Sequence, residues 1–499
     1  MTRTQQAADA PAGRLPASLL RIIAVVTMGA LMMQLDLTMT NIATRTWLRE
    51  FHSTLSVLQW VGTGYMLAMV VTIPLAGWAL ERFGARAVWT ACITLFLGGS
   101  VLCGAAWSPG SLIAFRILQG LGAGMVLPVG QTVLVQAAGP ERLNRAMAAL
   151  GVPAMLGPVL GPVLGGVLVD DLNWRWIFYV NVPVCLAALA LSRRAMPADR
   201  VPGDTRLDLT GLALLSPGCA AVVLGLAQTG SYGGFGDGHV LVPLAVGAAL
   251  LAAFAVNALR TSRVPLIDLR LFGRRPFASA SASIFVSGFV LFGAMGALPL
   301  YYQLARGDSA QHAGALLIPM GIGMGLSLMI SGRLADHVPP RTIALVGLLC
   351  TALGTSVYTQ VAVGTSDLLL SGAQVLSGAG IGATLVPIMS SAYRGLEPAA
   401  VPRASTSIRI MQQLGGSFGS AVLLIVTQHQ LSGHARTPAG LAAAFGATFW
   451  WILAFTAVLL LPVLFLPGRN PQRPAPQPPG PLAQDPLAQD PQTQDPQAG

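Results

Sequence analysis

Acidic residues are rare in the long apolar segments of this chain, and Asp36 is the one that falls well inside such a segment. A carboxylate in the bilayer costs about 3 kcal/mol on insertion scales, and burial favours its protonated form. A rise of about 1.5 Å per residue places Asp36 about 22 Å from the segment edge near Arg21, and Arg116 about 8 Å below the opposite edge. The two side chains can therefore meet, which predicts either a proton-exchange site or a permanent structural ion pair.

Arg409 is a second arginine inside an apolar segment. One intramembrane carboxylate and two arginines suit neutral or anionic amphiphiles better than strongly cationic compounds. Soft, aromatic and hydrogen-bonding side chains could line a polyspecific cavity, although any one of them is more often in lipid contact or in packing. The cavity candidates are Gln34, Asn41, Trp60, Tyr65, Tyr301, Gln303, Arg409 and Gln412.

The composition places these residues in a polytopic membrane protein. Hydrophobic residues make up 54% of the 499 residues and charged residues only 10%, against about 25% charged in soluble domains. The 29 basic residues are all Arg, so the chain lacks the Lys of a Walker A loop and of a Schiff base. The arginines lie between apolar segments rather than in one patch, so we expect a lipid bilayer partner and no nucleic acid. The five Cys lack metal-ligand spacing, and we expect no metal and no cofactor.

Apolar segments of 18 or more residues predict fourteen transmembrane helices. Assigning the N-terminus to the cytoplasm leaves 22 Arg inside and 5 outside, which is a strong positive-inside signal. Both termini are therefore expected to be cytoplasmic. The expected spans are 19–42, 55–80, 87–107, 111–136, 145–169, 175–192, 209–229, 239–259, 277–303, 311–332, 342–363, 367–392, 404–428 and 440–467.

The two halves of the chain also resemble each other at an offset of 258 residues. The glycines at 120, 122 and 124 match those at 378, 380 and 382, and Arg145-Ala146 matches Arg403-Ala404. Transporters are often built from such repeats, with substrate bound between them. The expected organisation is an N-terminal tail (1–18), a six-helix half (19–193), a linker with two extra helices (194–276), a second six-helix half (277–467) and a disordered Pro/Gln/Asp-rich cytoplasmic tail (468–499).

Several strings resemble the major facilitator superfamily, and specifically its fourteen-span drug:proton antiporter branch of the QacA and EmrB type. They include the segment from Leu35 to Ala43 (LDLTMTNIA), the loop from Gly77 to Arg86 (GWALERFGAR) and the Gly-Pro string from Gly157 to Gly166. Glu81 stands where the family usually has Asp, Thr44 replaces a usual Pro, and Gln412 stands where the family commonly has Arg. The fold class implied is an all-α integral membrane protein of the major facilitator fold with fourteen transmembrane helices.

The resemblance also implies roles for particular residues. It assigns proton coupling to Asp36 with Arg116, and export rather than import to the Gly-Pro string, where helix packing of the GxxxG kind is the simpler alternative. The gating residues implied are Gly77, Glu81, Arg82, Gly84, Arg86 and Asp336. The residues of the implied antiporter-type helix bend are Gly157, Pro158, Gly161, Pro162 and Gly165.

These features predict a proton-coupled exporter of hydrophobic small molecules, such as drugs or antibiotics, in the cell membrane. The protein is not expected to be an enzyme, and an accessory export partner is left open. The alternatives are a facilitator-fold transporter of one specific metabolite and, from another class, a membrane-embedded enzyme or sensor. An enzyme would need a clustered polar site, and only Asp36, Arg116 and Arg409 are available within the spans.

Overall fold

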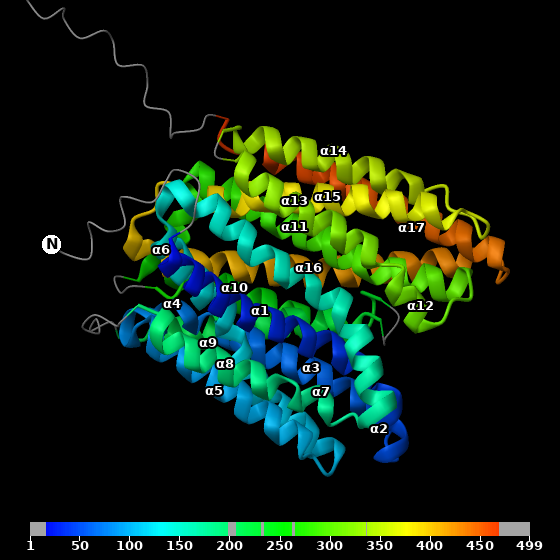
Figure 1. Cartoon of the computed structure of the whole chain (residues 1–499), viewed down its shortest axis with the longest axis horizontal. Helices are drawn as coiled ribbons and strands as arrows, with labels where there is room; N and C mark the ends of the chain where they lie inside the picture. The colour runs from blue at the N-terminus through cyan, green and yellow to red at the C-terminus, as the bar shows by residue number, and fades with distance from the viewer. Residues whose placement is uncertain (1–15, 198–205, 231–233, 262–264, 336, 469–499) are drawn as a thin grey trace, which may run out of the picture.

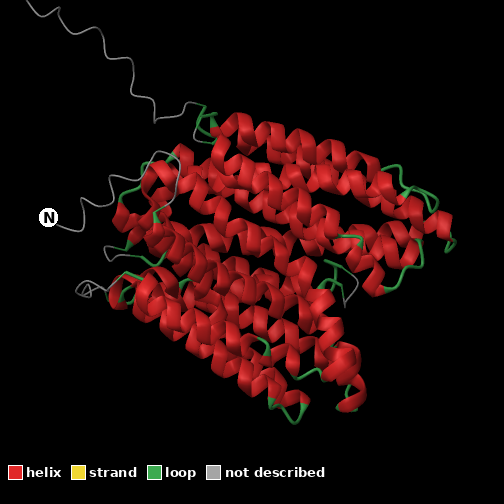
Figure 2. Cartoon of the chain, viewed as in Figure 1, coloured by secondary structure: helices red, strands yellow, loops and turns green. Residues whose placement is uncertain are grey.

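The computed structural model describes residues 16–197, 206–230, 234–261, 265–335 and 337–468, and all secondary structure in these residues is helical (Figure 2). Long apolar runs fold this way because a helix satisfies its backbone hydrogen bonds within the segment, which a bilayer requires. The helices of the first part are α1 (Ala17–Ile42), α2 (Thr44–Glu50), α3 (Leu55–Thr72), α4 (Leu75–Phe83), α5 (Ala85–Gly104), α6 (Pro109–Val167), η1 (Leu168–Leu172), α7 (Trp176–Tyr179) and α8 (Asn181–Ala195). Those of the remainder are α9 (Leu209–Gln228), α10 (Gly238–Arg260), η2 (Leu269–Gly273), α11 (Arg275–Leu300), η3 (Tyr301–Ala305), α12 (Ala310–Ala315), α13 (Ile318–Leu334), α14 (Pro340–Tyr358), α15 (Asp367–Ala392), η4 (Pro398–Ala400), α16 (Val401–Gly433) and α17 (Pro438–Leu464).

Twelve helices of the described residues are long and apolar enough to cross a membrane, and the pair α3 and α4, bent by 53°, would make a thirteenth span. Helix α6 runs through two of the expected spans, 111–136 and 145–169. Its backbone is interrupted between them at Gly139, which has a non-helical φ of 65°. The all-helical membrane fold is therefore confirmed. The count of fourteen spans stays a prediction.

The helices form two bundles that lie side by side (Figure 1). The first contains α1 and α3 to α8, and the second contains α11 and α13 to α17. Helices α9 and α10 pack on each other, and α9 also contacts α3 of the first bundle and α16 of the second. The start of α1 and the end of α17 lie at the same end of the molecule (Figure 1). The placement of this end of the molecule in the cytoplasm stays a prediction from the arginine distribution.

Repeated glycines hold equivalent helices together in the two bundles. A Cβ at Gly120 would meet the carbonyl oxygen of Tyr65 on α3, and one at Gly378 would meet the carbonyl oxygen of Met320 on α13. The two glycines are 258 residues apart and their two neighbours are 255 apart. The sequence repeat thus coincides with a repeat of backbone packing, in which the missing side chain lets two helices approach closely.

Candidate functional site

The centre of the candidate site is an ion pair inside the first bundle. Arg116 on α6 donates from Nη1 to Oδ2 of Asp36 on α1 at 2.6 Å, and both side chains are 0% exposed. The structure therefore brings together the two charged residues that the sequence placed at similar depth. Complete burial makes the pair costly to break, because each charge would be left uncompensated.

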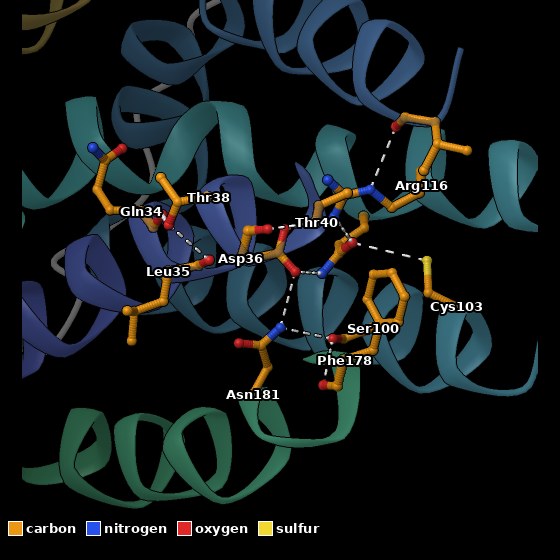
Figure 3. A network of polar contacts seen from close by, with 12 residues as sticks. Gln34, Leu35, Asp36, Thr38, Thr40, Ser100, Cys103, Arg116, Phe178 and Asn181 are labelled. Atoms are coloured by element: carbon orange, nitrogen blue, oxygen red, sulfur yellow. Dashed lines mark hydrogen bonds and ion pairs between the residues drawn. The ribbon is translucent and has the colours of Figure 1, made fainter. Parts of the chain in front are cut away.

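Neutral polar side chains complete the shell of the Asp36 carboxylate (Figure 3). Its Oδ1 accepts from Gln119 Nε2 at 2.9 Å and from Asn181 Nδ2 at 3.0 Å. Gln119 Oε1 in turn accepts from Arg116 Nη1 at 2.7 Å, and Asn181 also donates to Ser100 Oγ at 3.0 Å. Side chains of α6 and α8 thereby meet at the carboxylate carried by α1, and α5 joins the network through Ser100.

The side chains around Asp36 offer it only hydrogen-bond donors. The three side-chain contacts to its oxygens all come from N–H donors, and an ionised carboxylate can only accept hydrogen bonds. A proton on either oxygen would need an acceptor, so at least one donor must move away before Asp36 can keep that proton. A protonated Asp36 would therefore need at least one of these side chains to change its orientation.

Tyr65 on α3 covers the other face of Arg116. The guanidinium carbon lies 4.2 Å from the centre of the Tyr65 ring, a cation–π contact that supplies part of the solvation lost on burial. Tyr65 is 1% exposed and its hydroxyl has no hydrogen-bond partner among the described residues. The structure thus places this cavity candidate against the ion pair.

The loop predicted to be a gate contacts the opposite bundle. Arg403 at the start of α16 donates from Nη2 to Oε2 of Glu81 on α4 at 2.6 Å. Gly77 lies one turn earlier on α4, where a Cβ would meet the side chains of Thr406 and Arg403 on α16. The contact joins the two bundles at the end that carries both described chain ends (Figure 1).

The other gating candidates do not contact the second bundle through a described hydrogen bond or ion pair. Gly84 ends α4 with φ 81°, a conformation that favours glycine. Arg86 donates to the carbonyl oxygen of Met196 at 2.8 Å, beyond the end of α8, within the first bundle. Arg82 lies on the last turn of α4 and is partly buried, and Asp336 lies outside the described residues.

The Gly-Pro string packs against α1. A Cβ at Gly157 would meet the backbone and Cβ of Gln34, one at Gly161 would meet Thr38 Oγ1, and one at Gly165 would meet Met39. Thr38 also donates to the carbonyl oxygen of Gly157 at 3.3 Å. The side chains of Pro158 and Pro162 lie outside the described part, and α6 continues through both positions. The geometry matches close GxxxG-type packing, and the helix bend stays a prediction.

The cavity candidates do not converge on one pocket. Trp60 is 44% exposed and lines a cavity of about 450 Å³ beside α9, whereas Gln412 lines a cleft of about 30 Å³ within the second bundle. Tyr301 is fully buried and donates to the carbonyl oxygen of Ala362 at 3.2 Å, so its role there is packing. Partly buried Gln303 lies on η3, and the side chain of Asn41 lies outside the described part.

Sequence reasoning missed four participants, namely Gln119, Asn181, Ser100 and Arg403. Gln119 lies three residues after Arg116 and so on the same helix face, a signal that could have found it. Asn181 and Ser100 carried no such signal, because they lie on other helices. Among the described residues, no group of three His, Cys, Asp or Glu side chains could hold a metal ion.

Comparison with known proteins identifies the family of the chain that contains this site. The family model described as Major Facilitator Superfamily matches residues 26–420. The "Multidrug resistance protein B homolog" of Mycobacterium tuberculosis is 39% identical over 84% of this chain and 78% of its own length. The "Cephamycin export protein CmcT" of Amycolatopsis lactamdurans is 34% identical over 82% and 84% of the two chains. The "Puromycin resistance protein pur8" of Streptomyces alboniger is 32% identical over 88% of each.

Solved structures share the fold at low sequence identity. The human organic anion transporter MFSD10 aligns with a TM-score of 0.60 and 17% identity, covering 90% of this chain and 100% of that one. The proton:xylose symporter XylE aligns with a TM-score of 0.59 and 14% identity, covering 89% and 96% of the two chains.

Proposed function

Because this chain belongs to the Major Facilitator Superfamily and is therefore a multi-pass plasma membrane transporter rather than an enzyme, we propose that it exports hydrophobic small molecules by proton-coupled alternating access. The printed names of its relatives, which include a multidrug resistance protein homologue and a cephamycin export protein, support efflux. We further propose fourteen spans, arranged as six, two and six, with both termini in the cytoplasm.

The observation that carries the proposal is the fully buried Asp36 carboxylate of α1, which accepts hydrogen bonds from side chains of α6 and α8. A buried carboxylate that loses an N–H donor is driven toward its protonated form, because burial disfavours the charge. Uptake and release of a proton at Asp36 would thus favour different arrangements of α1, α5, α6 and α8. Arg116 holds the ionised form in one arrangement, and its withdrawal permits protonation in the other.

The Glu81–Arg403 contact supports a gate at the cytoplasmic end. An ion pair between the two bundles stabilises the state in which that end is closed, so it must break before substrate can enter from the cytoplasm. The second part of α6, packed on α1 through Gly157, Gly161 and Gly165, links this movement to the helix that carries Asp36.

Energised efflux from a pump-deficient host tests the proposal. We would measure export of neutral, anionic and cationic compounds with and without a protonophore, in the wild type and in Asp36→Asn. Asp237→Asn is a matched control, since it makes the same chemical change at an exposed carboxylate before α10, where Asn can also cap the helix. Efflux that the protonophore stops and only Asp36→Asn abolishes supports coupling at Asp36, and full efflux in Asp36→Asn would overturn it.

A further inference from the structure

A cavity of about 440 Å³ lies between the two bundles, close to the contact that joins Glu81 to Arg403. Its lining comes from α6 of the first bundle and from α15, η4, α16 and the turn after α15 in the second. Val401 lines it two residues before Arg403 on α16. Pockets for small organic molecules have volumes of about 300–1,000 Å³, so this cavity is large enough to hold one.

Direct hydrogen bonds also join the bundles around this cavity. Gln136 on α6 donates from Nε2 to the carbonyl oxygen of Pro398 on η4 at 3.2 Å, and both residues line the cavity. Asn144, a further lining residue of α6, donates from Nδ2 to the carbonyl oxygen of Ala335 after α13 at 3.2 Å. The cavity is therefore part of the interface between the bundles at this end of the molecule.

Equivalent residues of the two halves line the cavity from the two bundles. The break in α6 at Gly139 and the turn at Gly395 both have a positive φ, 65° and 68°, and a Cβ at either glycine would meet no atom within 4 Å. Lining residues that are 258 positions apart form three pairs. The pairs are Val135 with Tyr393, Gln136 with Arg394, and Leu143 with Val401.

Arg394 is the member of these pairs that carries a charge. Its side chain is partly buried, and it makes no hydrogen bond or ion pair with the residues that the structure describes. Arg409, the unpaired arginine inside α16, at least donates from Nη1 to Oε1 of Gln412 at 2.8 Å. Glu397, three residues after Arg394, is exposed and does not line the cavity. Burial lowers the pKa of Arg394, and no acid among the described residues offsets that cost.

The rest of the lining suits the apolar part of a ligand. Val135, Leu143 and Val401 line the cavity together with Leu396 and Pro398. An apolar lining with few polar groups is typical of small-molecule sites, in which the polar groups orient the ligand. A guanidinium without an acceptor can bind a carboxylate or a phosphate through two parallel N–H donors, a geometry that lysine cannot offer.

We propose that this cavity binds a small organic anion through Arg394, and that the bound anion holds the two bundles together at the cytoplasmic end. Because both bundles line the cavity, the anion must lose contacts before the bundles can separate there. The anion therefore slows export instead of being exported. This effect on transport rests on the proposed alternating-access function, whereas the binding does not.

Binding of a matched probe pair to the purified full-length protein in detergent tests the site without requiring transport. The probes are 1-naphthyl phosphate and neutral 1-naphthol, followed by fluorescence titration. We expect the wild type to bind the phosphate at least about tenfold more tightly, because charge-assisted hydrogen bonds are about twice as strong as neutral ones. Arg394→Gln should remove this preference, and Arg394→Lys should keep part of it. Arg341→Gln is the matched control, since it removes an exposed arginine at the start of α14.

Two results would overturn the site. They are equal binding of the two probes by the wild type, and a preference for the phosphate that survives in Arg394→Gln. Unchanged binding of 1-naphthol shows that a variant is folded, and Arg394→Lys provides a second test if Arg394→Gln is not.

Transport into inverted vesicles tests the effect on the bundles, because their outer face is the cytoplasmic one. External 1-naphthyl phosphate should slow proton-driven uptake by the wild type and by Arg341→Gln, but not by Arg394→Gln. An equal effect on all three proteins, or none on the wild type, would overturn the closing role. Failure of the export function is recognised separately, as absence of proton-driven uptake for every compound while the phosphate preference in binding persists.

Reconstitution separates the two sources of such an anion, a soluble molecule and a lipid headgroup. The protein is placed in phosphatidylcholine vesicles with and without phosphatidic acid, and the affinity for 1-naphthyl phosphate is measured in each. Weaker binding in the presence of phosphatidic acid, for the wild type and Arg341→Gln, would identify the lipid as an occupant of the site. Equal affinity in both vesicles would identify a soluble anion.

Discussion

The two bundles share their helix packing but differ in what they bury at the equivalent position. Arg116 lies four residues before Gly120, and Gln374 lies four residues before the matching Gly378. Arg116 meets a carboxylate, whereas buried Gln374 donates from Nε2 to the hydroxyl oxygen of Tyr302 at 2.9 Å.

This difference separates two tasks within one repeated architecture. Glycine contacts recur because both bundles need close helix approach. Of the two equivalent positions, the one in the first bundle carries a charged network, so a proton can change the local charge there, while the neutral amide and phenol in the second bundle keep the same charge at any physiological pH. The proton coupling that we propose therefore belongs to the first bundle, and Gln374 would serve structural support in the second.

The largest effect is expected from removing one charge of the buried pair. Asp36→Asn leaves Arg116 uncompensated and should cost about 3–5 kcal/mol of stability, as expected when one partner of a buried pair is lost. Thermal unfolding in detergent measures the loss, and efflux in vesicles measures coupling.

A double variant keeps this prediction testable if Asp36→Asn folds poorly. Asp36→Asn with Arg116→Gln removes both charges and should recover stability but not proton-driven efflux. If the double variant recovers both stability and proton-driven efflux, the ion pair has only a structural role, and the two bundles do not differ in proton coupling.

Overpacking of the shared glycine contacts should affect the two bundles alike. Gly161→Ala places a methyl group against Thr38, and the matching Gly419→Ala places one against the carbonyl oxygen of Phe289. Each should destabilise by about 1–3 kcal/mol. Gly166→Ala and Gly372→Ala are controls, because a Cβ at either glycine meets no atom within 4 Å. Destabilisation confined to one bundle would argue against equivalent packing.

Removing the side-chain amide of Gln119 or of Gln374 should destabilise the two bundles by different amounts. Gln119→Leu breaks hydrogen bonds to two charged groups and should cost about 1.5–3 kcal/mol, whereas Gln374→Leu breaks a neutral one and should cost about 0.5–1.5 kcal/mol. Gln119→Leu should also shift the pH dependence of efflux, since it frees one Asp36 oxygen. A pH profile that moves only in Gln374→Leu would reverse the assignment of the bundles.

The smallest stability effect is expected at the gate. Glu81→Gln weakens a partly exposed ion pair and should cost less than about 1 kcal/mol, yet it should slow turnover more than it weakens substrate binding. Glu50→Gln is the comparison, since Glu50 pairs with Arg175 at 2.9 Å within the first bundle. Transport kinetics that change equally in the two variants would mean that Glu81 does not act as a gate.

Local sequence pattern determined the helices, the depth of Asp36 and Arg116, and the glycine faces. Each of these depends on short-range physics: apolar runs must form helices in a bilayer, residues rise by a constant step along a helix, and every fourth residue shares a face. The offset of 258 residues between the two halves could also be found in the sequence, because glycines stand at equivalent positions where equivalent helices pack closely.

Tertiary structure alone decided which side chains share a contact. Asn181 reaches Asp36 from another helix and also bonds to Ser100 on a third, and Glu81 meets Arg403 from 322 residues away. Trp60 and Tyr301 lie apart although both side chains are of a kind that lines cavities. Helical periodicity reports which way a side chain faces relative to its own axis, but not which helix faces it, since that depends on how all the helices pack together.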